Sequence, residues 1–566
     1  MMKKNKPVRI TLAHINDTHS YFEPQSLQLQ LNIDGKIISP YVSNGGFSRI
    51  ATRAKQLKAR ALQHNRDFMF LHAGDCFQGT LYFSLFKGKA NSDMLNALGI
   101  DVMTIGNHEL DMGNEPVAEF LDRIKFPLLA GNWDLTNEIT TKSHYLNGRT
   151  NLLSYQPDTQ TARWMTRVLD DEPVAIFGVS LDKMADIANV DPDTPFVNAF
   201  ETARNTVQAI RKSGINKIIL LSHLGFNGDC ELAKEVDGIS LIVGGHSHTL
   251  QGDFSDLGLK KEVEYGHQVN GTYIVQAGFH SQALGHCDID FAADGSVTAF
   301  KGKNELLLGR RLCTDTSLLT AHNDNIHTKA SLYLTQHKNV VVCKKDPLLQ
   351  SLLQDKYIPR VRKLQSTVIA RVAEDMRHIR IPDINGGSDI APLVAESFAH
   401  MMNKSGHRVD FAIHNAGGVR TSLYQGNISV ADIAGKLLPF AVPIGAYRIK
   451  GKYIAQALEG AINNATNNGL LGSGSGSYPY TYNLDFNYYA ERPLGNRIAE
   501  LTINTAEDGW INIDHDMLYY GTSSAYTMKG KEGYEALTMM EGDGIITHHS
   551  MADCFIDFIK NTPDRL

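Results

Sequence analysis

The sequence predicts a layered α/β fold followed by a second domain. Short runs rich in Val, Ile and Leu alternate with helical patterns from residue 8 to about residue 300, which is typical of sheets covered by helices. Residues that can bind metals follow several of these runs. The 566 residues exceed what a single hydrophobic core accommodates, so at least two domains are expected.

Five buried strands are predicted in the first half because each is a nearly continuous apolar run. They lie at residues 68–73, 102–105, 174–177, 217–221 and 239–243, and an earlier strand is expected at residues 8–15. From Phe47 to Ala61, apolar residues recur at helical spacing. One amphipathic helix packed on the sheet is therefore expected there.

The pattern becomes irregular at residues 300–345, and a helix with a clear start follows. Asp346 supplies a capping carboxylate and Pro347 occupies the first helical position. Pro359 is expected to kink or end this helix because proline lacks the backbone N–H.

The domain junction is therefore placed at residues 345–365, as a linker helix. It separates a first domain at residues 8–344 from a second at residues 366–566. The second domain mixes both element types, with a strand expected at residues 408–413 and a helix at residues 451–464.

Composition and charge exclude several classes of protein. Hydrophobic residues make up 42% and charged residues 20% of the chain, as in ordinary soluble globular proteins. The 55 Lys and Arg against 61 Asp and Glu give a net charge of -6, which offers no basic footprint for nucleic acid or an anionic membrane. No stretch is long and apolar enough to predict a membrane span.

The start of the chain is basic like a signal peptide, but residues 8–15 already form a predicted strand and no apolar segment intervenes. We therefore expect a cytoplasmic protein, with a periplasmic form whose signal has been removed as the alternative. The six cysteines are scattered without a CxxC pair, which favours a reducing compartment and leaves a disulfide open. The sequence indicates no oligomeric state.

Five segments that follow apolar runs carry ligand-type residues. They are Asp17-Thr18-His19, Gly74-Asp75, Gly106-Asn107-His108-Glu109, Ser222-His223 and Gly244-Gly245-His246-Ser247-His248. Any one of them alone is more often a turn, a surface feature or a packed histidine. Together they supply the carboxylate, imidazole and amide oxygen that two neighbouring divalent cations need, so a two-metal hydrolytic centre is predicted.

The spacing within the segments adds detail. Asp17 and His19 are one residue apart, so on a strand both side chains would point to the same face. Asp111 follows His108 by three residues, so in a helical turn its carboxylate can orient the imidazole.

These motifs resemble the signature of the calcineurin-like metallophosphoesterases. Asn107-His108-Glu109-Leu110-Asp111 and Gly245-His246-Ser247-His248 resemble the forms of its 5′-nucleotidase branch, as does Asn44-Gly45-Gly46-Phe47-Ser48-Arg49. The resemblance covers about residues 8–300. It implies a four-layer α/β/β/α sandwich followed by a smaller α+β substrate-binding domain.

The resemblance further implies two divalent ions that share one carboxylate. The implied ligands of one ion are Asp17, His19, Asp75 and His248, and those of the other are Asp75, Asn107, His223 and His246. His248 stands where some relatives have glutamine. This mixture of ligands accepts Mn, Zn, Co, Ni or Fe, so the metals are not identified.

The second half resembles the 5′-nucleotidase C-terminal domain at Asn415-Ala416-Gly417-Gly418-Val419-Arg420 and Leu437-Leu438-Pro439-Phe440. Without the first half, the former segment would be interpreted as a tight turn. The resemblance implies a nucleotide site in which two aromatic rings sandwich the base and arginines clamp phosphate. Its implied residues are Arg380, Asn415, Gly417, Gly418, Arg420, Phe440, Gly476, Tyr526 and Glu532.

Three departures from the family pattern bear on the identity of the substrate. Glu532, within Gly530-Lys531-Glu532-Gly533, stands where an aspartate contacts the ribose hydroxyls. The loop Ala441-Val442 lacks a glycine and a polar residue common in relatives. Arg380 is followed by an apparent insertion at residues 382–388.

These features predict metal-dependent hydrolysis of nucleotide 5′-phosphate esters by a metal-activated water, and the resemblance implies that rotation of the second domain delivers the substrate. His108, oriented by Asp111, would stabilise the transition state or protonate the leaving alkoxide. The alternatives are a diphosphatase of nucleotide sugars or dinucleotides and a 2′,3′-cyclic nucleotide phosphodiesterase. A non-enzymatic nucleotide-binding or surface protein would not need the complete ligand set.

Overall fold

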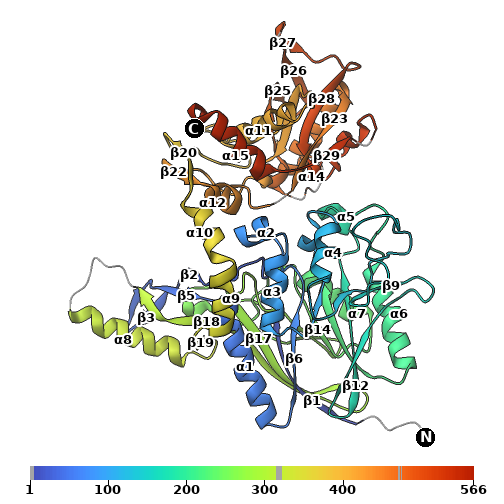
Figure 1. The fold of residues 1–566 in the computed structure, drawn as a ribbon, viewed down its shortest axis with the longest axis vertical. Coiled ribbons are helices and arrows are strands. Elements are labelled where there is room, and N and C mark those ends of the chain that lie inside the picture. Colours follow the sequence, from blue (N-terminus) through green and yellow to red (C-terminus); the bar gives the residue numbers. More distant parts are fainter. Residues whose placement is uncertain are drawn as a thin grey trace. The chain divides into compact units, whose positions relative to one another are not determined.

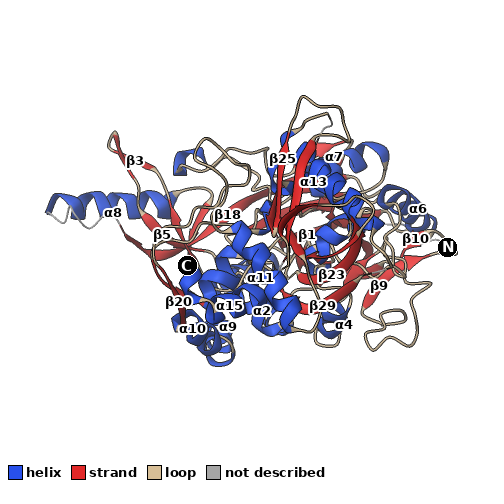
Figure 2. Ribbon diagram, turned by 90° about the horizontal axis from the view of Figure 1, so that it is seen from above, coloured by secondary structure: helices blue, strands red, loops and turns tan. Residues whose placement is uncertain are grey.

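The computed structural model describes residues 6–313, 321–440, 442–469, 472, 474–505, 507–542 and 544–566 (Figure 1). The chain forms two compact units. The first extends to Ile358 except for Gly79–Leu85, which groups with the second unit, Pro359–Leu566. Each unit contains both helices and strands (Figure 2).

The first unit contains two large sheets. The strand order of the first is β10-β9-β8-β7-β6-β1-β17-β18-β5-β2, with β19 paired to β18. Its bounds are β1 Val8–Ile15, β2 Gln25–Gln28, β5 Tyr41–Asn44, β6 Asp67–His72, β7 Val102–Thr104, β8 Leu128–Ala130, β9 Leu152–Gln156, β10 Thr161–Ala162, β17 Ala283–Phe291, β18 Val297–Cys313 and β19 Val340–Val342. The short hairpin β3 Leu31–Ile33 and β4 Lys36–Ile38 is separate.

The second sheet has the order β11-β12-β13-β14-β16-β15. Its strands are β11 Met165–Leu169, β12 Glu172–Ser180, β13 Lys217–His223, β14 Leu241–Val243, β15 His267–Val269 and β16 Thr272–Val275. Each of the five buried strands predicted from the apolar runs is present, with bounds that differ by a few residues.

The two sheets pack face to face around one apolar core, to which Leu12 of β1, Leu71 of β6 and Leu221 of β13 contribute. Helices α6 Ala199–Lys212 and α7 Gly225–Glu235 share a second core with the outer face of the second sheet. Helix α1, Phe47–Gln63, contacts β1 and β6 on the outer face of the first sheet. This arrangement confirms the predicted four layers.

Helix α1 confirms the expected amphipathic pattern, because Phe47, Ile50, Ala54, Leu57 and Ala61 are buried. The other α-helices before residue 340 are α2 Leu81–Phe86, α3 Lys89–Leu98, α4 Glu115–Leu121, α5 Met184–Ile187 and α8 Ala321–Gln336.

The irregular stretch predicted at residues 300–345 is more regular in the structure. β18 continues for 17 residues and pairs with both β17 and β5. The register shifts between Leu308 and Leu312. Such an irregularity interrupts the alternation of side chains, which explains why the sequence shows no clear period there.

The predicted linker contains two helices. α9, Pro347–Lys356, is capped by Asp346, whose Oδ1 accepts a hydrogen bond from the backbone N–H of Leu349 at 3.1 Å. α10, Ile358–Ser366, follows directly, so the first helix ends before Pro359 as expected from proline geometry.

The second unit is built on a sheet with the order β24-β21-β28-β23-β29. Its strands are β21 Phe411–Asn415, β23 Pro443–Lys450, β24 Pro479–Tyr482, β28 Leu518–Ser524 and β29 Ile545–Ser550. Two smaller sheets comprise β20 Val368–Val372 with β22 Gly426–Ser429, and β25 Leu484–Tyr488, β26 Ile498–Thr505 and β27 Gly509–Asn512. The helices are α11 Ala391–Lys404, α12 Val430–Asp432, α13 Gly451–Thr466, α14 Ala525–Met528 and α15 Met551–Asn561.

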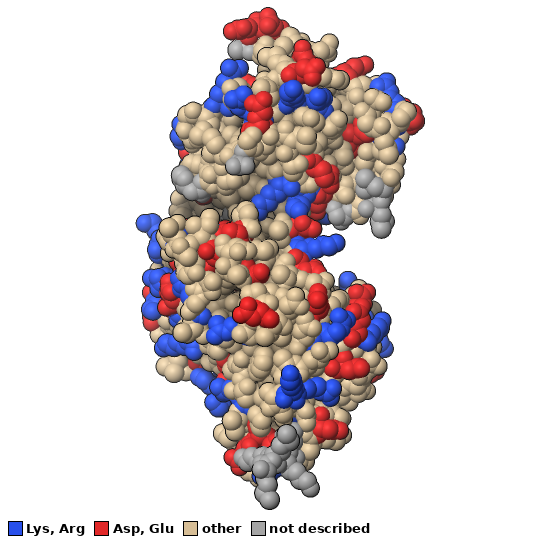
Figure 3. Space-filling model, turned by 90° about the vertical axis from the view of Figure 1, so that its right-hand side faces the viewer, with Lys and Arg blue, Asp and Glu red and all other residues tan. Residues whose placement is uncertain are grey.

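The surface carries charges of both signs. On the face shown in Figure 3, Lys and Arg are interspersed with Asp and Glu. Among the described residues, no helix is both long and apolar enough to cross a bilayer.

The core between the sheets predicts a large effect of truncation. Leu12→Ala should lower the free energy of unfolding of the first unit by about 2–5 kcal/mol, because it removes a fully buried side chain between two sheets. Leu62→Ala, at a side chain that is 65% exposed, is the matched control and should change this free energy by about 0.5 kcal/mol or less. Urea denaturation measures both, and equal effects would contradict the assignment of the core.

Candidate metal centre

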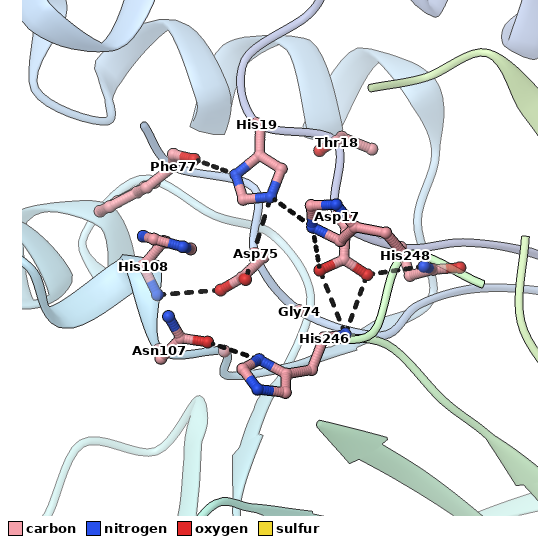
Figure 4. A network of polar contacts seen from close by, with 12 residues as sticks. Asp17, Thr18, His19, Gly74, Asp75, Phe77, Asn107, His108, His246 and His248 are labelled. Atoms are coloured by element: carbon pink, nitrogen blue, oxygen red, sulfur yellow. Dashed lines mark hydrogen bonds and ion pairs between the residues drawn. The ribbon is translucent and has the colours of Figure 1, made fainter. Parts of the chain in front are cut away.

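The predicted metal ligands converge at strand ends (Figure 4). β6 pairs in parallel with β1 and with β7, and β13 pairs in parallel with β14, so the carboxyl ends of these strands share an edge within each sheet. Asp17 and His19 follow β1, Asp75 follows β6, Asn107 follows β7, His223 ends β13, and His246 and His248 follow β14.

The ligand-type side chains form three groups, and within each group the ligand atoms lie within 4.8 Å of one another. They are Asp17 with His19 and His248, His19 with Asp75 and His108, and Asp75 with His223 and His246. Asp75 and His19 each belong to two groups. The structure therefore brings the predicted carboxylates and imidazoles together, with Asp75 between the two sides of the cluster.

His223 shows why this position attracts a cation. Its Nδ1 lies 2.7 Å from the carbonyl oxygen of Ala73, and its Nε2 lies 3.1 Å from Oδ2 of Asp75. When Nδ1 donates to the carbonyl, Nε2 and the carboxylate both present lone pairs. Burial lowers the pKa of His223, but the charge of Asp75 and its hydrogen bond outweigh burial and raise the pKa to about 9. Positive charge is thus favoured between the two groups.

The other side of the cluster has the same character. Nδ1 of His19 lies 3.2 Å from the carbonyl oxygen of Phe77, while Nε2 lies 3.2 Å from Nε2 of His248. Nε2 of His248 lies 3.4 Å from Oδ1 of Asp17. Burial lowers the pKa of His19 to about 4, so this imidazole is neutral and can offer a lone pair to a metal.

Asn107 joins the cluster through its side-chain oxygen, which lies 3.0 Å from Nδ1 of His246. The backbone N–H of His246 donates to both carboxylate oxygens of Asp17, at 3.0 and 3.1 Å. Carboxylate, amide oxygen and imidazole together suit first-row divalent cations. The residues present therefore fit two such ions, whose identity is not determined.

The backbone at the cluster is strained. Asp17, His19, Asp75, His246 and His248 all have positive φ, between 46° and 72°. Residues other than glycine rarely adopt this conformation, and it concentrates at functional sites. The expectation that Asp17 and His19 share one strand face was wrong, because β1 ends at Ile15 and both residues lie in the turn beyond it.

Two glycines permit the close approach of the segments. A Cβ at Gly106 would lie 2.2 Å from Oδ1 of Asp75, and one at Gly74 would lie 2.6 Å from Nδ1 of His223. Gly74 also has a φ of 89°. Any larger residue at either position would displace a predicted ligand.

Glu109 holds two of the ligand loops together, and the sequence analysis assigned it no role. One carboxylate oxygen accepts from the backbone N–H groups of Asp75 at 2.9 Å and Gly106 at 2.7 Å. The other accepts from those of Cys76 at 2.7 Å and Phe77 at 3.0 Å. Its position directly after His108 in the motif could have drawn attention to Glu109. The sequence does not show that four backbone N–H groups surround its carboxylate, because folding brings them there.

Two further residues at the cluster were missed. Asn16 donates to Oδ2 of Asp17 at 2.6 Å and accepts from the backbone N–H of Ala277 at 2.8 Å. The ring of His280 lies 5.6 Å from that of His19, centroid to centroid. A strand and then a glycine, Gly278, precede His280 as they precede the ligands of other segments, and that repetition could have identified it.

His108 and Asp111 form the predicted pair. Nδ1 of His108 lies 2.7 Å from Oδ2 of Asp111, within and directly after the short 3-10 turn His108–Leu110. Burial lowers the pKa of His108, but the charges of Asp111 and Asp75 outweigh burial and raise the pKa to about 10. The backbone N–H of His108 also donates to Oδ1 of Asp75 at 2.9 Å. The pair is thus attached directly to the cluster.

In the second unit, the predicted substrate residues gather around two loops. Asn415 ends β21, and Gly417 and Gly418 form the turn that follows. A Cβ at Gly417 would lie 3.1 Å from Cα of Gly476, so these two loops are in close contact. Nη1 of Arg420 donates to the carbonyl oxygen of Gly417 at 3.3 Å.

Arg420 also lies over the ring of Phe440, with 5.4 Å from its Cζ to the ring centroid. Burial, and to a lesser degree the charge of Arg380, lowers the pKa of Arg420. Two neighbouring like charges favour an anion between them.

Tyr526 lies in α14, and Glu532 has a φ of 56° in the loop that follows. Because Ile444 of β23 pairs with Ser524 of β28, Phe440, which precedes β23, and Tyr526, which follows β28, lie toward the same end of these two strands. Ala441, the first residue of the loop Ala441-Val442, lies outside the described residues.

Comparisons with known proteins agree with this arrangement. Residues 10–250 match the calcineurin-like phosphoesterase family, and residues 368–539 match the 5′-nucleotidase C-terminal domain. The chain is 28% identical to the NAD 5′-nucleotidase of Haemophilus influenzae over 99% of this chain and 91% of that protein. It is 29% identical to a probable 5′-nucleotidase of Treponema pallidum over 93% of this chain and 87% of that protein. The solved 5′-nucleotidase precursor from Thermus thermophilus is 27% identical, with a TM-score of 0.67, over 98% of this chain and 97% of its own.

Glu109→Gln tests the link between the ligand loops. The substitution replaces one acceptor oxygen by an NH₂ group and leaves two backbone N–H groups without acceptors, so affinity for Mn²⁺ should fall by about 10–100-fold. Glu119→Gln, at an exposed glutamate of α4, is the matched control. Equilibrium dialysis measures the affinity, and equal values for both variants would refute a supporting role of Glu109.

Proposed function

Because the chain belongs to the 5′-nucleotidase family, with a calcineurin-like phosphoesterase domain and a 5′-nucleotidase C-terminal domain, we propose that it hydrolyses the 5′-phosphate ester of nucleotides to a nucleoside and phosphate. The observation that carries this proposal is the convergence of carboxylates and imidazoles around Asp75. The relatives named as 5′-nucleotidases and the solved structure of similar fold support the choice of substrate class.

The proposed metal ligands are the seven residues named from the sequence: Asp17, His19, Asp75, Asn107, His223, His246 and His248. When bound, two divalent ions would supply the Lewis acidity that activates water and neutralises charge on the phosphoryl group. Asp75 would serve both ions, because its carboxylate faces imidazoles on both sides of the cluster.

His108 is the proposed catalytic residue. Asp111 fixes one ring nitrogen at 2.7 Å, so the orientation of the other nitrogen is set before the substrate arrives. In this position His108 can stabilise charge on the phosphoryl oxygens or donate a proton to the leaving alkoxide.

The second unit supplies the proposed nucleotide site. Arg380 and Arg420 would hold a phosphate, because the positive charge of Arg380 acts on Arg420, which itself lies beside the glycine turn and the ring of Phe440. Phe440 and Tyr526 would stack on the base. Every nucleobase has a π face, so this stacking does not depend on which base is present. Delivery of the nucleotide by rotation of this unit stays a prediction.

A dinucleotide is the second candidate substrate. The relative matched over 99% of this chain is named an NAD 5′-nucleotidase. Glu532, the loop Ala441-Val442 and the insertion at residues 382–388 are the positions at which this chain departs from the family pattern, so they are candidates for setting the preference.

A substrate panel with metal reconstitution tests the proposed activity. Chelator-treated protein should be inactive, and Mn²⁺, Zn²⁺ or Co²⁺ should restore phosphate release from AMP. NAD, UDP-glucose and 2′,3′-cAMP are the comparison substrates. A higher kcat/KM for NAD than for AMP would favour the dinucleotide, and activity that survives complete metal removal would refute the proposal.

His108→Asn separates catalysis from metal binding. It removes the proposed proton donor, so kcat should fall by about 10²–10⁴-fold. Metal content, measured by elemental analysis, should be unchanged because His108 is not among the seven proposed ligands. His515→Asn, at an exposed histidine of the second unit, is the control. A variant of unchanged kcat would exclude the assigned role.

A further inference from the structure

A depression on the outer face of the first sheet is lined by basic side chains. Its volume is about 460 Å³, within the ~300–1,000 Å³ typical of small-molecule sites. Arg9, Arg60, Arg66, Lys301 and Lys303 contribute to the lining, with one carboxylate, Asp288. The chain as a whole has a net charge of -6, so this local excess of positive charge is not expected from composition.

The depression follows from the alternation of side chains in three adjacent strands. Leu12 of β1 and Ile289 of β17 point into the core between the sheets. Their neighbours in sequence therefore face outward. Register places Asp288 of β17 beside Lys301 of β18, and His286 beside Lys303. The last turn of α1 adds Arg60 to the same face.

The Arg9 end of the depression is remote from the metal centre along β1, whereas His286, at its other end, pairs with Ala13. Arg9 lies near the start of β1, six residues before Ile15, where the strand ends. At ~3.3 Å per residue this separation is on the order of 20 Å. The depression and the metal centre are therefore different sites on the same sheet.

The carboxylate that lines the depression is already neutralised. Oδ1 of Asp288 accepts from Oγ1 of Thr11 at 2.6 Å and from Nη2 of Arg60 at 2.9 Å. Arg66 forms an ion pair with Asp290 at 2.6 Å and also donates to two backbone carbonyl groups, so its guanidinium is fixed in place. Because Asp288 is paired with Thr11 and Arg60, its negative charge repels a bound anion only weakly.

Two of the remaining cations, Lys301 and Arg9, are less completely paired. Lys301 has no ion pair with any residue that the structure describes, and Arg9 lies 4.0 Å from Asp290. Lys303 lies 3.1 Å from Glu305, a carboxylate that Arg53 also engages at 2.6 and 2.9 Å, and it donates to the carbonyl oxygen of Lys338. Around the depression, six cations stand against three carboxylates: Arg9, Arg53, Arg60, Arg66, Lys301 and Lys303 against Asp288, Asp290 and Glu305.

A buried polar group in the lining also calls for a partner. His286 is only 4% exposed, and its Nδ1 has no hydrogen-bond partner among the described residues. Buried polar atoms of this kind are rare unless a ligand, ion or water completes them. The carboxyl end of α1 adds a partial negative charge of ~0.5, which is much smaller than the excess of cations.

We propose that this depression is a second anion site, which takes the phosphate or diphosphate group of a small molecule. Arginine forks match phosphate oxygens, and the lysines add unspecific attraction. Nothing in the proposed hydrolysis uses these residues, so the site stands independently of that function.

The probe is methylenediphosphonate, which a phosphatase cannot hydrolyse, titrated into the metal-loaded protein in a calorimeter. The test variant is Arg9→Gln with Lys301→Gln and Lys303→Gln. The control variant removes the same three charges at exposed lysines elsewhere in the first unit, as Lys58→Gln with Lys125→Gln and Lys212→Gln. Wild type and the control variant should bind one equivalent of methylenediphosphonate more than the test variant does. If the test variant still binds this additional equivalent, its affinity should be at least tenfold lower.

Equal binding by the test and control variants would overturn the proposal, as would loss of binding in both. If the triple variant does not fold, Lys301→Gln alone serves, because Lys301 supports no ion pair among the described residues. It should weaken the additional binding several-fold with kcat for AMP unchanged, and unaltered binding would refute the site.

Two further titrations identify the source of the anion. Inorganic phosphate and α,β-methylene-ADP are compared with methylenediphosphonate on wild type and on the triple variant. A larger variant-dependent loss for the nucleotide would indicate a nucleotide ligand, and a loss confined to the free anions would indicate phosphate or diphosphate itself. Absence of any variant-dependent loss for all three probes would overturn the proposal.

Discussion

The carboxylate of Asp75 is buried among imidazoles, and its surroundings must compensate for this charge. Burying an ionised group without a partner is costly, so the site is stable only with positive charge between the donors. The raised pKa of His223 shows that a proton can supply that charge between its ring and Asp75. Metal ions compete for the same positions because they satisfy the same lone pairs. One electrostatic demand therefore explains both the packing of the cluster and its chemistry.

The rest of the first unit serves to hold that cluster. Parallel strands with apolar side chains on both faces form a rigid base, and the strained turns at their carboxyl ends carry the polar residues. Glu109 connects the turn after β6 to the turn after β7 through backbone hydrogen bonds. The strain of the left-handed residues is thus supported by contacts that the turns could not make in isolation.

Charge in this protein is organised locally. The two arginines in the second unit and the basic depression in the first occur in a chain of net negative charge. In each place, cations are held near one another by backbone carbonyl groups, aromatic rings or shared carboxylates. Such small clusters of cations attract anions over short distances. They suit the compact charge of a small phosphorylated ligand and are too limited in extent for an extended polyanion.

The order of residues alone determined the element types and the chemistry of the ligand segments, because apolar runs and the polar residues after them are local properties. It also determined the capping of α9 by Asp346 and the end of that helix before Pro359. Only the tertiary structure decided which groups meet. The three donors to Glu109 from Asp75, Cys76 and Phe77 lie more than 30 residues before it, and the cations beside His286 come from segments farther apart. Pairing over such distances depends on how the sheets and helices pack, which no local pattern records.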